Sequence, residues 1–273
     1  MIWEVRIKDK RSYLVGASHI FSRSFKDFFK TIISSVQTVI FEGPLDEQSL
    51  QKVVNIGSQN TSSNLYEIIS PDTLKLLTQQ FVKFSSCKIN PVIKEHAERQ
   101  IKEYYISEIE RILKNYRHWM AFFSIWYLFL ELLDWKNSID LEIFNIAKEN
   151  EKDIFHLETI EEQIEAMEGI PVERILRFFE KANFWEIYAK TYEKLYLEGQ
   201  WNKLITHTTE FPSRCESIVD KRDPILFERM IPYVEKGDSL IVVGIIHTEG
   251  IIKRLLKEGW SVNFFLKNPS KSV

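Results

Sequence analysis

The sequence predicts an α/β protein with a central mixed, mainly parallel sheet that is flanked by helices and carries a helical insertion. Three observations predict this fold. Short apolar segments alternate with amphipathic helical segments along much of the chain. The segment SLIVV at 239–243 has the continuous hydrophobicity of a strand that is buried on both faces of a parallel sheet. Glycine follows several apolar segments, at the points where the chain would turn from strand to helix.

The N-terminal part predicts a hairpin followed by a β-α-β unit. The first segment alternates apolar and polar residues, as a half-buried strand does, and residues 9–11 supply a turn. The expected elements are strands at 2–7, 12–15 and 38–41, with a helix at 24–37 before the last of them. Because β-α-β units favour parallel strands, we expect the second and third strands in one parallel sheet.

The middle of the chain predicts a helical insertion or lid at about 48–120. Its pattern is helical and polar, and Ser70-Pro71 is typical of an N-cap followed by proline in the first helical turn. The apolar stretch Trp119–Leu133 is shorter than the about 20 residues that span a membrane, so we expect a buried core helix and no membrane span. An alternative use of this stretch, as half of a homodimer interface, is a hypothesis.

The C-terminal half predicts a second alternation of helices and strands. The expected elements are helices at 139–150, 160–167, 224–236 and 251–258 and strands at 153–157, 239–243 and 260–266. Gly237 and Gly259 are expected to close the last two helices. Because no repeat and no low-complexity segment divides the chain, we expect a single domain over residues 1–273.

Composition limits the partners and the location. Lysine and arginine total 36 against 39 acidic residues, a net charge of -3, and no basic block occurs along the chain. Nucleic acid binding needs clustered positive charge, so we expect no nucleic acid partner. Cys87 and Cys215 suggest neither a disulfide framework nor a thiolate metal site, and residues 1–11 lack the apolar run of a secretory signal. We therefore expect a cytoplasmic protein.

Four apolar strands end in a residue that can bind a metal or transfer a proton. These residues are His19, Glu42, Glu158 and His247. In open parallel sheets ligands bind outside the C-terminal ends of the strands, so these side chains are expected to converge. A strand followed by Gly-x-x-His occurs twice, at Gly16 and at Gly244. We expect each glycine to adopt a conformation that other residues resist, and each imidazole to lie near a helix start that favours an oxyanion.

Two imidazoles with one or two carboxylates suit a divalent ion such as manganese, cobalt, iron or zinc. Water bound to that ion would be the nucleophile, with the remaining glutamate as general base. Each pattern also has a structural explanation, because a lone Gly-x-x-His is a weak signal and a glutamate after a strand often caps the next helix.

Four further residues are candidates for the same site. Arg222 and Asp223 precede the helix expected at 224–236 and could clamp a substrate carbonyl or carboxylate, since guanidinium is a planar fork of donors, and a surface salt bridge is the competing explanation. Asp140 and Gln163 lie in the helices before and after the strand that ends at Glu158, where they could hydrogen-bond to the site residues and orient them. Helix capping would explain Asp140 nearly as well.

These motifs resemble the TraB/GumN superfamily, which includes the Tiki metalloproteases and the TraB/PrgY pheromone-shutdown proteins. The resemblance extends from about Ser12 to Val262 and rests on four segments: YLVGASHIFS, VIFEGPLD, IDLEIFNIAKENEKDIFHLETIEEQIEAM, and KRDPILFERM with LIVVGIIHTEGI. It implies a fold like that of Tiki and erythromycin-esterase-like proteins, and a metal-dependent hydrolase that acts on peptides.

The resemblance also implies which residues form the site. It implies metal ligands at His19, Glu42 and His247 and catalytic roles for Glu42, Glu158 and Arg222, and the remaining expected site residues are Gly16, Ser18, Gly244, Asp140 and Gln163. Two departures concern substrate contacts more than the metal site. Ser18 stands where the family often has threonine, and Asp223 and Pro224 follow Arg222 where many members have asparagine.

Three functions stay open on the sequence alone. The leading hypothesis is a metal-dependent peptidase that acts on a peptide or small-molecule substrate. The second is a metal-independent hydrolase that uses a histidine and a glutamate in ester cleavage. The third is a regulatory protein that binds a peptide or small ligand in a groove lined by Trp126, Trp185 and Trp201. The aromatic content of 13% also suits a packed core and does not separate these hypotheses.

Overall fold

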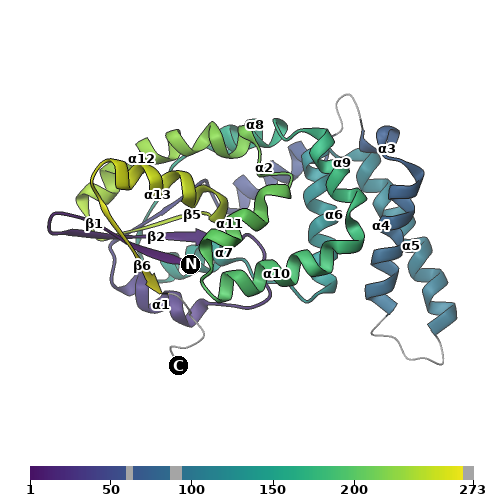
Figure 1. Ribbon diagram of the computed structural model, residues 1–273, viewed down its shortest axis with the longest axis horizontal. Coiled ribbons are helices and arrows are strands. Elements are labelled where there is room, and N and C mark those ends of the chain that lie inside the picture. The colour runs from purple at the N-terminus through teal and green to yellow at the C-terminus, as the bar shows by residue number, and fades with distance from the viewer. Residues whose placement is uncertain (60–63, 87–93, 267–273) are drawn as a thin grey trace.

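A six-stranded sheet forms the centre of the protein in the computed structural model, which describes residues 1–59, 64–86 and 94–266 (Figure 1). The strand order is β4-β3-β5-β2-β1-β6. The strands are β1 Ile2–Ile7, β2 Lys10–Ala17, β3 Thr38–Phe41, β4 Asp153–His156, β5 Ser239–Gly244 and β6 Ser261–Leu266. β4, β3, β5 and β2 are parallel, whereas β1 pairs antiparallel with β2 and β6. The predicted mixed, mainly parallel sheet is confirmed.

The hairpin turn between β1 and β2 is tighter than the sequence predicts. The register pairs Ile7 with Lys10, so only residues 8 and 9 form the turn. Lys8 has a φ of 53°, as two-residue hairpin turns commonly require. β2 therefore begins at Lys10 and runs on through Gly16 to Ala17.

The apolar strand β5 lies between β2 and β3, and all six of its residues are buried. Its neighbour β3 is also buried at all four positions. This burial follows from the helices that cover both faces of a parallel sheet. Because the four strands β4, β3, β5 and β2 run the same way, their C-terminal ends meet at one edge.

Helices on opposite faces enclose the sheet. α12 Arg222–Lys236 and α13 Thr248–Lys257 pack together on one face, and α12 contacts β2 and β5. α1 Lys26–Ser34 packs against α7 Ile139–Glu149 on the other face (Figure 1). The helices lie on both faces because the connections between parallel strands are right-handed. Connections that run in opposite directions along the sheet therefore place their helices on opposite faces.

The predicted insertion after β3 consists of helices. They are α2 Glu47–Gly57, α3 Leu65–Ile68, α4 Pro71–Ser86 and α5 Lys94–Asn115. Ser70 caps α4, since the backbone N–H of Thr73 donates to Ser70 Oγ at 3.1 Å and Pro71 is the first helical residue. In Figure 1, α3, α4 and α5 lie at the end of the molecule away from the β1-β2 hairpin. A lid function for this segment stays a prediction.

The apolar stretch forms α6 His118–Leu132, whose residues are all at least half-buried except Glu131. Its aromatic side chains pack on later helices, with Trp126 and Phe178 ring centroids 5.3 Å apart and Phe129 and Trp185 centroids 5.2 Å apart. In the described ranges, no helix combines the length and the apolar character needed to cross a membrane. The homodimer stays a hypothesis.

Four more helices follow β4 along the chain. They are α8 Ile160–Glu168, α9 Val172–Glu180, α10 Trp185–Leu197 and α11 Trp201–His207. The buried apolar side chains form one cluster that extends from the strands to α4 and α5. The packing of the helical part is thus continuous with that of the sheet.

Two helices begin earlier than the sequence predicts. α12 begins at Arg222, so Pro224 is its third residue. A proline is tolerated there, because the N–H groups of the first helical turn have no partner within the helix. α13 begins at Thr248, directly after the 3-10 turn Ile245–His247. Arg222 and Asp223 therefore lie in the first turn of a helix that packs on the sheet.

Candidate active site

Four chain segments bring polar side chains to the C-terminal edge of the parallel strands. Glu42 follows β3 directly, Glu158 follows soon after β4, His247 ends the short turn after β5, and His19 follows β2. The strand order places these four segments side by side. The backbone N–H of Glu158 even donates to the carbonyl oxygen of Glu42 at 3.0 Å.

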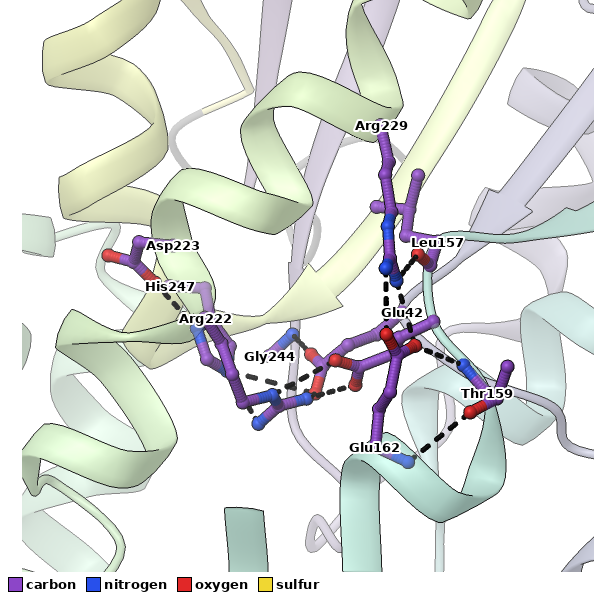
Figure 2. Close-up of polar contacts among 10 residues, drawn as sticks. Glu42, Leu157, Thr159, Glu162, Arg222, Asp223, Arg229, Gly244 and His247 are labelled. Atoms are coloured by element: carbon purple, nitrogen blue, oxygen red, sulfur yellow. Dashed lines mark hydrogen bonds and ion pairs between the residues drawn. The ribbon is translucent and has the colours of Figure 1, made fainter. Parts of the chain in front are cut away.

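Arg222 is the centre of a buried charge network (Figure 2). Its Nε donates to Oε2 of Glu158 at 3.0 Å and its Nη2 to Oε1 of Glu158, which makes the pair bidentate. Nη2 also donates to Oε1 of Glu42 at 2.5 Å. Arg222 is 9% exposed and Glu158 only 6%. The ion pairs of Arg222 therefore lie in the protein interior, and a surface salt bridge does not explain this residue.

The two glutamates have different proton affinities. Burial acts to raise the pKa of Glu42, but the positive charges of Arg222, His247 and His19 and a hydrogen bond from the Gly244 N–H (2.8 Å) outweigh it and lower this pKa. Burial, reinforced by the negative charge of Glu42, raises the pKa of Glu158 despite Arg222. Glu42 therefore stays ionised, and Glu158 is the carboxylate that accepts a proton more readily.

His247 is held by a carboxylate that the sequence did not assign to it. Its Nδ1 lies 2.7 Å from Oδ1 of Asp223, and its Nε2 lies 3.5 Å from Arg222 Nη1 and 3.7 Å from Glu42 Oε1. His247 is 1% exposed. Gly250 in α13 makes room for this contact, because a Cβ there would lie 1.8 Å from Asp223 Oδ2.

His19 has a matching partner in Asp140. Its Nδ1 lies 2.6 Å from Oδ2 of Asp140, whose Oδ1 accepts a hydrogen bond from Ser138 at 2.5 Å. The Asp140 charge raises the pKa of His19 to about 9, and the charges of Glu42 and Arg222 act on it as well. Ser138, not Asp140, is the N-cap of α7, so capping does not account for Asp140. The His19 side chain stays 59% exposed.

The two histidines thus repeat one arrangement. In each, Nδ1 faces a buried aspartate that is the second residue of a helix, Asp140 in α7 and Asp223 in α12. A carboxylate on Nδ1 fixes the tautomer, so Nε2 is the atom that faces substrate, water or metal. At His247 this atom lies 3.5 Å from Arg222 Nη1, a contact that such a ligand would replace. Sequence analysis missed the role of Asp223, because the helix start expected at Pro224 left Asp223 outside the helix.

The reason predicted for the two motif glycines is wrong. Gly244 has a φ of -55°, and neither Gly16 nor Gly244 is among the glycines with positive φ. At Gly16 the requirement is space instead, because a Cβ there would lie 2.3 Å from Ile245 Cδ1 and 3.0 Å from Thr248 Cγ2. At Gly244 a Cβ would lie 3.4 Å from both Glu42 Oε2 and His247 Cδ2, which is an ordinary contact distance, so space alone does not require this glycine.

The predicted helix start beside each imidazole is found at one histidine only. α13 begins directly after His247, whereas α1 begins only at Lys26, well beyond His19. The loop after β2 bends before it enters α1, so the chain has no helix N-terminus at His19 itself. Only the second motif combines an imidazole with a helix start.

Ser18 and Gln163 support the site from the side. Ser18 Oγ donates to the carbonyl oxygen of Ile20 at 2.9 Å and so shapes the loop that carries His19. The Gln163 side chain acts to lower the pKa of the Glu158 carboxyl, against the effect of burial. It fills the space beside Gly43, where a Cβ would lie 2.4 Å from the Gln163 amide. Both side chains position site residues.

The residues fit a divalent ion in part. In the part of the chain that the structure describes, no group of three or more His, Cys, Asp or Glu side chains is close enough to hold a metal ion. Glu42 is engaged by Arg222 and Gly244 through its two oxygens. Both histidines have the carboxylate on Nδ1 that metal-binding histidines usually have, and at His247 an ion would have to replace the contact of Nε2 with Arg222 Nη1. Glu42 would fit once Arg222 releases Oε1.

The fold and this edge of the sheet define an α/β protein whose polar site combines two His-Asp pairs with an Arg-Glu network. The sequence model of the TraB/PrgY/gumN family matches residues 1–263. The chain belongs to this family, as its motifs predicted. No curated protein and no solved structure matches it.

Proposed function

We propose that the protein is a hydrolase that cleaves a peptide or another small carbonyl substrate at the C-terminal edge of its parallel strands. The observation that supports the proposal most strongly is the pair of histidines whose Nδ1 atoms each face a buried aspartate. Imidazoles held in this way are suited to bind a metal or to transfer protons at Nε2. The peptide substrate rests on the resemblance to the Tiki metalloproteases.

In the leading form of this proposal a divalent ion takes part, with His19, His247 and Glu42 as its ligands. Such an ion would polarise the substrate carbonyl and lower the pKa of bound water. Glu158, whose pKa is raised by burial, is the residue that takes the proton from the attacking water. Arg222 donates from Nη1 to the oxyanion that develops on the carbonyl.

A second form needs no metal, and the contact between Arg222 and Glu42 favours it. Arg222 already supplies a positive charge where Glu42 would bind an ion. His247, oriented by Asp223, would then be the general base at Nε2. His19, with its pKa raised to about 9, would be protonated at neutral pH and would donate a proton to the leaving group.

The groove expected for the third hypothesis, a binding protein, is not formed by its three tryptophans. Trp126 and Trp185 pack on one another with centroids 5.4 Å apart and are 5% and 1% exposed. Trp201 lies elsewhere, where its Nε1 donates to Thr248 Oγ1 at 2.9 Å. A binding function without turnover would therefore need another surface.

The test is turnover of a mixed peptide library, followed by mass spectrometry, in the presence of manganese, cobalt, iron or zinc in turn. We expect cleavage by the wild type, loss of cleavage in His247→Ala, and full cleavage in the surface variant Lys253→Gln. Inhibition by a chelator would support the metal-dependent form, and chelator-resistant cleavage would support the other. Peptides that bind tightly and stay intact under all conditions would overturn the proposal.

A further inference from the structure

A pocket lies in the helical part of the protein, apart from the candidate active site. It opens between α9, the 3-10 turn Ala182–Phe184, α10 and the end of α11, and it encloses about 250 Å³. None of its lining residues belongs to the candidate active site. Its volume lies near the lower end of the range of roughly 300–1,000 Å³ for small-molecule sites, so it suits a compact occupant.

The floor of this pocket is aromatic and fixed by packing. We call Phe178, Trp185, Tyr188 and His207 the aromatic floor, in which Tyr188 and His207 are half-buried and the 5% and 1% exposed Phe178 and Trp185 support them from beneath. Phe178 and Trp185 stack with centroids 5.3 Å apart, and Trp185 Nε1 donates to the carbonyl oxygen of Phe178 at 3.0 Å. The rings of Tyr188 and His207 stack at 4.3 Å. Flat, immobile ring faces suit a planar apolar ligand, because little side-chain freedom is lost on binding.

The rim of the pocket is positively charged. We call Arg174, Arg177 and Lys181, which recur on one side of α9 and its C-cap, the cationic rim. Among the lining residues that the structure describes, the only carboxylate is Glu210, which pairs with Lys181 at 3.1 Å. Three cations against one carboxylate favour an anionic group on the ligand.

Two lining residues, Arg174 and Tyr188, also have a buried polar atom without a hydrogen-bond partner in the described part of the chain. Arg174 Nη2 donates to the carbonyl oxygens of Thr209 and Phe211 at 2.6 and 2.9 Å, which fixes the guanidinium. Its Nε and the hydroxyl of Tyr188 are buried and have no hydrogen-bond partner within the described ranges. Buried polar atoms are usually hydrogen-bonded, and a polar group bound in this pocket would give these two atoms a partner.

We propose that this pocket binds a small molecule with a flat apolar body and one anionic group, such as an aromatic carboxylate. The body lies on the aromatic floor, and the anionic group faces the cationic rim. This site is separate from the proposed hydrolytic site, and neither proposal depends on the other.

The test uses three probes that share one ring system and differ in charge. They are 2-naphthoate, neutral 2-naphthylmethanol and cationic 2-naphthylmethylamine, each titrated into the protein at low salt by ligand-observed NMR. We expect 2-naphthoate to bind at millimolar concentration or below, and about tenfold more tightly than the amine, because rim charges each contribute a modest amount.

Four variants show whether the probes occupy this pocket. Arg177→Gln combined with Lys181→Gln removes the preference for the anion, whereas Lys203→Gln, a charge change on exposed α11 surface, keeps it. Phe184, 58% exposed at the mouth, offers a change that spares the core, and Phe184→Ala weakens all three probes alike. His19→Ala, which removes an active-site side chain that is 59% exposed, leaves 2-naphthoate binding unchanged. Equal affinity for the three probes, no binding of any, or binding that survives the rim and mouth variants would overturn the proposal.

Discussion

Asp223 Oδ1 lies 2.7 Å from Nδ1 of His247, and Asp223 directly follows Arg222, which binds Glu42 and Glu158. One dipeptide in the first turn of α12 therefore holds both the second histidine and the two glutamates. A π-helical turn at Glu216–Asp220 leads into this turn. Such irregular turns are frequent at functional sites, and here the turn sets the point at which α12 enters the site.

Asp223→Asn is expected to lower hydrolysis with little change in fold. Asparagine keeps the shape, but it removes the charge that orients His247, and loss of such a partner typically costs about 10–100-fold in metal affinity or activity. Asp140→Asn should act in the same way through His19. The measurement is kcat and metal affinity for both variants beside Lys253→Gln. Wild-type activity in both variants would show that the pairs are structural only.

Removal of Arg222 is expected to destabilise the protein strongly. Arg222→Met leaves Glu42 and Glu158 buried without their cation, and breaking a buried pair in this way costs about 3–5 kcal/mol. Arg229→Gln on the same helix breaks a half-exposed pair with Glu162 and a hydrogen bond to the carbonyl oxygen of Leu157, and should cost less, about 1–2 kcal/mol. Urea denaturation measures both. Equal losses in the two variants would contradict the central position of Arg222.

In the metal-free protein, His19 is expected to titrate well above its ordinary pKa of 6.5. Asp140 raises the pKa of His19 to about 9, so the protonated form is the one that folding favours. The stabilisation is fully present below pH 6.5 and is lost as the pH rises through about 9. NMR titration of the imidazole measures this, and Asp140→Asn should move the pKa back toward 6.5. An unchanged pKa in that variant would disprove the pairing.

Gly250→Ala is expected to destabilise the protein although the position is helical. Alanine in a helix interior gains about 1 kcal/mol over glycine. Here the added Cβ would lie 1.8 Å from Asp223 Oδ2, and such overpacking costs about 1–3 kcal/mol and moves Asp223 away from His247. Thermal denaturation and activity of Gly250→Ala are compared with Lys257→Ala on the exposed side of α13. A more stable and fully active variant would contradict this role of Gly250.

The sequence predicted the sheet well, because its strands carry local signals. The SLIVV segment is apolar throughout and lies where it was expected, in a strand between two parallel neighbours. The convergence of Glu42, Glu158 and His247 also followed from sequence, since strand ends of a parallel sheet share one edge.

The pairings within the site could not be predicted, because they depend on tertiary contacts. Arg222 reaches two glutamates through a long side chain whose direction only the packing of α12 sets. The partnership of Asp223 with His247 was hidden, because Pro224 suggested a later helix start. The glycines were explained by backbone conformation, whereas neither has a positive φ, and at Gly16 the close approach of Ile245 leaves little room for a Cβ.

The most direct test of the account is whether His19 and His247 serve one site. The measurement is the binding of manganese, cobalt, iron and zinc by isothermal titration to the wild type, His19→Ala and His247→Ala, with circular dichroism as the control for folding. The leading form of the proposal predicts one bound ion in the wild type and loss of that ion in each folded variant. An ion that remains bound in either variant, or a wild type that binds none of the four, would contradict it.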